Sequence, residues 1–68
     1  MTVLQQTFGE RIREFRLAKR MTQAELAQRL NMQQSDLCDL EKGRHAATLS
    51  TVERVANALG VPPTALIG

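Results

Sequence analysis

The sequence predicts an all-α fold, a compact bundle of five helices with no sheet. Apolar residues recur at spacings of three and four along most of the chain, which is the period of one helix face. Two Thr-x-x-Glu segments precede such runs, and this spacing is typical of capped helix N-termini. No segment shows the apolar–polar alternation of a half-buried strand.

Length and composition indicate one small domain, which we expect to span residues 1–68. The chain is 43% hydrophobic with only two phenylalanines and no other aromatic residue, so aliphatic side chains must build its core. The formal net charge is +2, and the basic excess lies within residues 11–20. The single cysteine, the absence of a leader-like N-terminus and the absence of any apolar run near ~18 residues predict a soluble cytoplasmic protein without a membrane segment.

The first helix is expected to begin at Thr7–Glu10, which has the spacing of a capping box. Phe8, Ile12 and Phe15 then share one face, and the arginines occupy the opposite face. We expect this helix to end near Lys19 or Arg20.

The second helix is expected to begin at Thr22–Glu25, a second capping box. Asn31 follows at its end, where a left-handed residue is needed and Asn tolerates that conformation. A third helix is predicted over about residues 33–42, with Gly43 as its stop. The inward residues of these two helices are expected to be Leu26, Ala27, Leu30, Leu37 and Leu40.

Thr48 is the expected cap of a fourth helix, although residues 50–53 form a competing capping box. Gly60 ends this helix, and Pro62 and Pro63 suit a turn before a short final helix over residues 64–67. One apolar stripe is predicted along the fourth helix, formed by Leu49, Val52, Ala56 and Leu59.

Residues 22–42 have the layout of a helix-turn-helix, which inserts its second helix into the DNA major groove. Ala27 is small enough for a close helix crossing, Asn31 suits the turn, and Leu37 and Leu40 can dock the second helix on the first. A helical hairpin with no DNA role is the alternative.

The polar residues of the predicted recognition helix are candidates for reading bases. Gln33 and Gln34 project from its start, and a glutamine amide can pair with the edge of adenine. Ser35 and Asp39 lie on the outward arc once Leu37 faces the core. For contacts to phosphates the candidates are Gln23, Lys42 and Arg44.

The segment from about Phe8 to Leu66 resembles the lambda-repressor-like (Cro/Xre-type) helix-turn-helix family. The run Thr22–Ala27, the turn after it and the later Leu-Glu-x-Gly carry this resemblance, and the overall length is similar to that of stand-alone controller proteins of restriction-modification systems. The resemblance implies a five-helix bundle that dimerises on a palindromic operator. It also implies that Gln23 contacts the phosphate backbone and that Gln33, Gln34, Ser35 and Asp39 face base edges. A structural ion pair between Arg16 and Glu41 is implied as well.

The charge of the recognition helix departs from the family pattern. Residues 33–44 contain Asp36, Asp39 and Glu41 against Lys42 and Arg44, so the segment is net negative and should bind phosphates weakly. Asp39 either accepts a hydrogen bond from cytosine, or it is merely solvated or repels the DNA phosphates.

Val61, Leu66 and Ile67 are more apolar than a terminal turn needs for its own packing. They predict either a homodimer interface or burial in the monomer core. Both alternatives stay open at this point.

We therefore expect a sequence-specific regulator of transcription that binds double-stranded DNA as a homodimer, controlled by its own concentration or by a protein partner. The alternative is a protein-interaction module or antitoxin with the same fold, which the acidic recognition helix favours. With one histidine, one cysteine and no Gly-rich phosphate loop, the sequence predicts no enzyme, no cofactor and no metal. Cys38 is expected to be a passive side chain rather than a redox switch.

Overall fold

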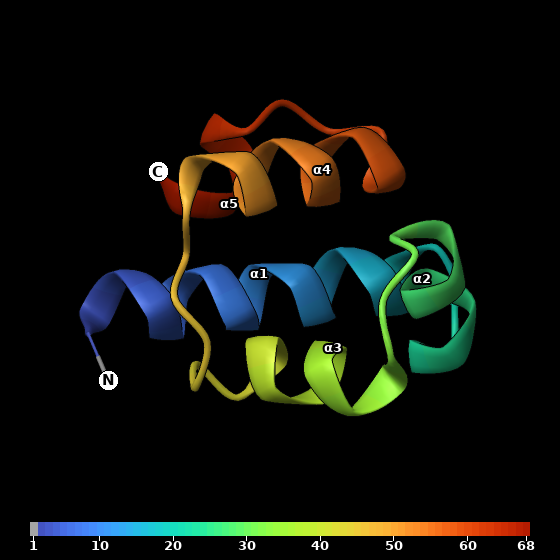
Figure 1. Cartoon of the computed structure of the whole chain (residues 1–68). Coiled ribbons are helices and arrows are strands. Elements are labelled where there is room, and N and C mark those ends of the chain that lie inside the picture. Colours follow the sequence, from blue (N-terminus) through green and yellow to red (C-terminus); the bar gives the residue numbers. More distant parts are fainter. Residues whose placement is uncertain (1) are drawn as a thin grey trace.

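The longest helix, α1, lies at the centre of the fold and separates two groups of shorter helices (Figure 1). The computed structural model describes residues 2–68. Its helices are α1 (Val3–Ala18), α2 (Gln23–Arg29), α3 (Gln34–Glu41), α4 (Leu49–Leu59) and α5 (Thr64–Ile67). One side of α1 packs against α4 and α5, and the other side packs against α3, which also contacts α2. The predicted fold class, an all-α bundle, is confirmed.

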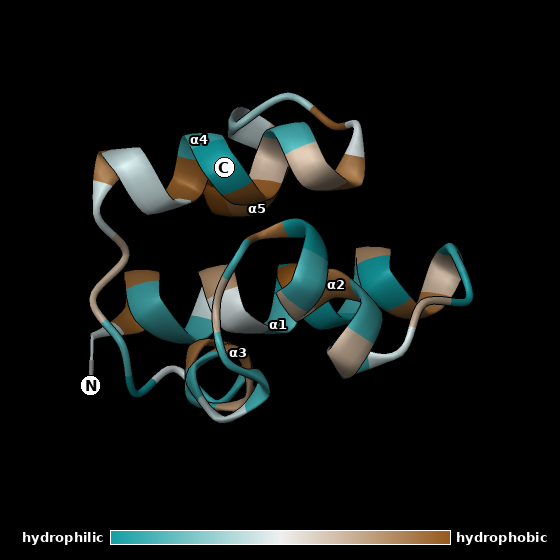
Figure 2. Ribbon diagram, turned by 45° about the vertical axis from the view of Figure 1, so that its right-hand side comes forward, coloured by the Kyte–Doolittle hydropathy of each residue, from teal (hydrophilic) through white to brown (hydrophobic). Residues whose placement is uncertain are grey.

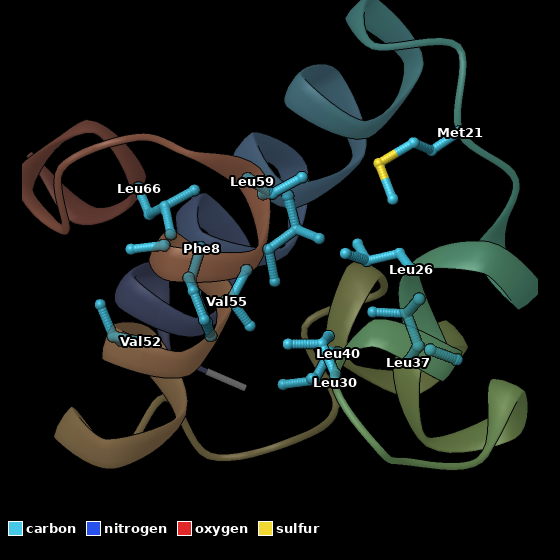
Figure 3. Close-up of a cluster of buried hydrophobic side chains, with 13 residues drawn as sticks. Phe8, Met21, Leu26, Leu30, Leu37, Leu40, Val52, Val55, Leu59 and Leu66 are labelled. Carbon is cyan, nitrogen blue, oxygen red and sulfur yellow. The ribbon is translucent and has the colours of Figure 1, made fainter.

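The core lies between these helices and is almost entirely aliphatic (Figure 3). The hydrophobic residues of α4 and α5 face α1, and polar residues cover the outer side (Figure 2). The buried hydrophobic residues are Phe8, Ile12, Met21, Leu26, Ala27, Leu30, Leu37, Leu40, Val52, Val55, Ala56, Leu59 and Leu66. Among residues 2–68, no helix combines the length and the apolar character that crossing a membrane requires.

The start of α1 was predicted at the wrong residue. The helix begins at Val3, because Thr2 and Gln5 form a capping box one turn before the expected one. The Thr2 hydroxyl accepts from the Gln5 amide at 3.1 Å, and Gln5 Oε1 accepts from the Thr2 amide at 3.0 Å. Gln replaces Glu in this role without loss of geometry, so the later Thr7 lies inside the helix.

The predicted caps of the other long helices are confirmed. Thr22 and Glu25 form a reciprocal capping box at the start of α2. Thr48 rather than Ser50 caps α4, and its hydroxyl accepts from the Thr51 amide at 3.2 Å.

Four helices end in the same way, with a residue in the left-handed conformation. Asn31 takes this conformation as predicted, Gly43 and Gly60 take it at the predicted helix stops, and Arg20 takes it at φ 56° although it carries a side chain. After each of these residues the next amide donates to a carbonyl five residues earlier, as Met32 does to Ala27 at 3.0 Å. The chain therefore reverses sharply at every one of these ends.

The inward position predicted for Leu49 is wrong, and of the two alternatives left open for Leu66 the structure shows burial in the monomer core. Leu49 is 72% exposed rather than inward, and Val55 fills the core in its stead. Side chains lean toward the N-terminus of their helix, so the first residue of α4 projects past the core. Leu66 is fully buried in the core of the monomer, where α5 packs on α1, and it therefore has no surface to offer a dimer interface.

Candidate nucleic-acid interface

The candidate interface is the exposed face of α3 together with the loop that follows it. Leu26 and Ala27 of α2 and Leu37 and Leu40 of α3 are buried, so the inner sides of both helices are held in the core. The left-handed Asn31 turns the chain between them. This packing leaves the outer side of α3 uncovered.

The N-terminal end of α3 presents three exposed polar residues. Gln33, Gln34 and Ser35 are all exposed, and Gln33 occupies the cap position without a side-chain hydrogen bond to the helix. The amide groups of the two glutamines are therefore turned toward solvent rather than used in the fold. These are the residues expected to read bases.

Beyond Ser35 the outer side of α3 is more covered. Asp36, Asp39 and Cys38 are only partly exposed, whereas Lys42 and Arg44 are exposed. The imidazole Nε2 of His45 lies 4.0 Å from Asp39 Oδ2, close enough for an ion pair when the imidazole is protonated.

A buried network at the other side of α3 is built on Glu41. Arg16 Nε donates to Glu41 Oε2 at 2.7 Å and its NH2 group donates to Oε1 at 3.1 Å, so the pair is bidentate. Arg16 NH1 also donates to the Met21 carbonyl at 2.9 Å. Both charged side chains are less than one tenth exposed. The ion pair that the family resemblance implied is thus present, and it joins α1 to α3.

This network changes the charge of the interface. The Glu41 carboxylate is neutralised by Arg16 and withdrawn from the surface. Along residues 33–44 the remaining acids, Asp36 and Asp39, equal the remaining bases, Lys42 and Arg44. The expectation of a net negative recognition surface is therefore wrong, because it counted a charge that tertiary contacts remove.

Gln23 belongs to the same network. Its Nε2 donates to Glu41 Oε1 at 3.1 Å, which orients the amide between α2 and α3. An amide nitrogen has two N–H donors, and this bond uses one of them. Gln23 also lines a hollow of about 220 Å³, together with Arg13, Cys38 and Lys42.

The basic run of α1 does not form one solvated face. Arg16 is buried, and Arg11 NH1 donates to the Ala65 carbonyl at 3.0 Å, which ties α5 to α1. Arg13 is exposed beside Lys42 at the hollow, and Lys19 and Arg20 are exposed at the end of the helix. The sequence pattern could not separate these roles, since they depend on distant segments.

Several residues that shape the interface were missed. Gly9 lies where α1 crosses the end of α3, and a Cβ there would come within 2.4 Å of the Leu40 carbonyl oxygen. Arg54 of α4 donates to the Leu30 carbonyl at the end of α2. A glycine inside an otherwise favourable helix is a sequence signal for such a close approach, whereas nothing near Arg54 indicates its partner.

The capping box of α2 affects one titrating group. The Thr22 backbone amide, followed by its hydroxyl, donates to Glu25, and these hydrogen bonds hold the pKa of this carboxyl below its usual value. The charged form of Glu25 therefore stabilises the start of the helix-turn-helix.

The profile of the helix-turn-helix domain family matches residues 7–66 of the chain. The chain belongs to this family. Its helix-turn-helix is formed by α2 and α3, and the lambda-repressor-like (Cro/Xre) type inferred from the residue pattern is confirmed.

Named relatives of this helix-turn-helix protein are regulators. An immunity repressor protein of Bacillus phage phi105 is 42% identical over 62 residues, which cover 91% of this chain and 43% of the phage protein. Control protein C.BamHI of Bacillus amyloliquefaciens is 34% identical over 61 residues, covering 88% of this chain and 75% of that protein. The chain thus spans less than half of the phage repressor's length but most of the control protein's.

The fold is similar to that of a solved controller protein. The restriction-modification controller protein C.AhdI from Aeromonas hydrophila superposes with a TM-score of 0.84 at 32% identity, covering 91% of this chain and 94% of that one. The names of these three similar proteins, a repressor, a control protein and a controller protein, all describe regulation.

Proposed function

We propose that the chain is a sequence-specific DNA-binding regulator of transcription that binds a palindromic operator as a homodimer, with α3 in the major groove. The exposed polar start of α3 carries this proposal. Gln33 and Gln34 direct unused amides outward from a helix whose inner side is buried, and a glutamine amide matches the N6 and N7 edge of adenine. Ser35 beside them can donate to or accept from either kind of base pair.

Phosphate contacts would come from both sides of α3. Lys42 and Arg44 are exposed after its last turn, and Gln23 lines the same hollow as Lys42. Such contacts place the helix in the groove without reading sequence. Because Glu41 is neutralised internally, it does not oppose them.

Asp39 has two possible roles in this complex. It is partly exposed on α3 and can accept a hydrogen bond from the N4 amino group of cytosine, or it can simply repel phosphates. An Asp39→Ala variant distinguishes them. Tighter binding with unchanged base preference would mean repulsion, and relaxed preference at one G·C pair would mean reading.

The dimer interface is proposed on the layer opposite α3, where α4 and α5 cover α1 (Figure 1). Ile67 is 38% exposed and Val61 is half-buried, so both retain apolar surface after the monomer has folded. A homodimer on a palindromic operator is expected to place its two copies of α3 in half-sites about 34 Å apart, one turn of DNA.

Selection from random duplex DNA at moderate salt tests the proposal. We expect an enriched palindrome, bound by two protomers per site, with affinity that falls steeply as salt rises. Gln34→Ala should cost about 1–3 kcal/mol and relax preference at one base pair per half-site. Asn57→Ala, which removes an exposed amide on α4 and not on α3, is the matched control for base reading and should leave the base preference unchanged.

The opposite result points to a different function. No enriched sequence and little DNA affinity at any salt would contradict the proposal and favour the alternative, a protein-interaction module or antitoxin on the same fold. A protein partner and a cytoplasmic location remain predictions from the sequence.

A further inference from the structure

The loop that leaves α3 is held against the first turns of α1, forty residues away in the sequence (Figure 1). Gln5 Nε2 donates to the His45 carbonyl oxygen at 2.8 Å. The other end of the same amide, Oε1, accepts from the backbone amide and the hydroxyl of Thr2, each at 3.0 Å. One side chain therefore both caps α1 and binds the loop.

A second contact fixes the start of the loop. Gly43 is buried with φ +76°, and a Cβ on it would lie 3.2 Å from Gln6 Cα. The turn thus rests directly on the α1 backbone. Arg44 follows, and its amide donates to the Asp39 carbonyl at 2.9 Å.

Arg44 consequently lies between two anchored residues, Gly43 and His45, while its own side chain is exposed. Its backbone is thus held by contacts within the protein. A loop ordered in advance does not lose its conformational freedom on binding, and this strengthens a contact that the loop makes.

We propose that Gln5 is a positioning residue for DNA binding, which holds residues 43–45 so that Arg44 meets a phosphate of the operator. This inference rests on the proposed function. In this proposal Gln5 contacts no base and affects DNA binding only through the loop.

Gln5→Glu tests the proposal, because glutamate preserves the capping oxygen but loses the N–H that binds His45. It also sets a carboxylate against a carbonyl oxygen. Gln6→Glu is the control, since it adds the same charge at an exposed position of the same turn and keeps the backbone and Cγ atoms that lie nearest to Gly43. We expect Gln5→Glu to weaken operator binding about five- to tenfold relative to Gln6→Glu, the size of one lost hydrogen bond.

The salt dependence and a double substitution show whether the effect passes through Arg44. In Gln5→Glu, the magnitude of the slope of log K against log salt concentration should decrease toward that of Arg44→Ala. The decrease should be at most about 0.9, the value for one phosphate contact. In an Arg44→Ala background, Gln5→Glu should cost no more than Gln6→Glu. A Gln5→Glu penalty that persists undiminished in that background would overturn the proposal, and so would equal affinities of the two glutamate variants.

Folding is controlled separately. Circular dichroism melts of both variants set a temperature at which each is fully folded. Should Gln5→Glu not fold, Gln5→Met removes the donor without adding charge, with Gln6→Met as its control and the same expected difference. A wild type that selects no operator refutes the proposed function, whereas a wild type that selects one while the Gln5 and Gln6 variants bind alike refutes only the role of Gln5.

Discussion

The two ends of α3 differ in how the protein holds them. The N-terminal end carries Gln33 and Gln34, both exposed, and Gln33 makes no capping hydrogen bond. At the C-terminal end, Glu41 receives hydrogen bonds from Arg16 and Gln23, and the backbone of Gly9 lies directly against the last turn.

This difference shows how a short helix can be held firmly in the fold and still present free polar groups to a ligand. Eight residues are too few for a helix to be stable by itself in water, so α3 depends on tertiary contacts. Those contacts are concentrated at its buried side and its last turn. The first turn keeps its polar groups unused, as an interface for a ligand requires.

The largest expected effect on stability comes from removing Arg16, the cation that holds the C-terminal end of α3 through Glu41. Arg16→Met would leave the Glu41 carboxylate buried with only the Gln23 amide as partner, and breaking a buried ion pair in this way costs about 3–5 kcal/mol. A domain of this size has about 3–10 kcal/mol of stability in total. Urea unfolding measures the loss.

The double variant Arg16→Met, Glu41→Gln is the control for this experiment, because a neutral amide needs no cation. It should recover a large part of the stability. A loss below about 1 kcal/mol for Arg16→Met alone would mean that the pair does not anchor α3.

Gly9→Ala should be the next largest effect. The new methyl would lie 2.4 Å from the Leu40 carbonyl oxygen and 2.6 Å from that of Glu41, so α1 and α3 must move apart. We expect a loss of about 1–3 kcal/mol, even though alanine is the better helix former. Thermal unfolding measures it, with the exposed neighbour Glu10→Ala expected to stay within about 0.5 kcal/mol.

At the N-terminal end of α3, a substitution is expected to raise the stability of the fold rather than lower it. Gln33→Ser supplies a hydroxyl that can cap α3, and stability should rise by about 1 kcal/mol. Operator affinity should fall in the same protein, because an amide expected to read a base is lost. Thr48→Ala, which removes an existing cap, should lower stability by a similar amount. If Gln33→Ser left stability unchanged, the start of α3 would already be capped adequately in the wild type.

The smallest effect concerns pH. Unlike α3, α2 begins with a full capping box, and its hydrogen bonds depress the pKa of Glu25 in the folded state. A depressed carboxyl pKa stabilises the fold above the unfolded value and loses that contribution as pH falls through the folded value. Below pH 4.5, the usual pKa of this carboxyl, the melting temperature of the wild type should therefore fall more steeply with decreasing pH than that of Glu25→Gln. Melting temperatures of the wild type and Glu25→Gln that fall in parallel as the pH is lowered would contradict this prediction.

Local signals predicted most of the fold. Thr22, Thr48, Asn31 and Gly60 act where the pattern placed them, because capping and left-handed termination involve residues only a few positions apart. The wrong start of α1 is a failure of the same kind, since two boxes competed and the earlier one, with Gln5, formed.

The candidate interface was predicted in part. Periodicity placed Leu37 and Leu40 inward, and from this the exposure of Gln34 and Ser35 follows. The roles of these exposed residues in reading bases remain predictions. Leu49 was misplaced, and the choice between burial and a dimer interface for Leu66 could not be made, because exposure at a helix end depends on what the rest of the chain covers.

Helix positions, the turn of the helix-turn-helix and its family could be derived from the sequence, because each depends on interactions within a few residues. The fate of individual charges could not. Arg16 and Arg13 are alike in sequence, yet one is buried on Glu41, 25 residues away, and the other is exposed. Only the packing of α1 against α3 decides which carboxylates are neutralised, and it thereby sets the charge that the proposed DNA surface presents.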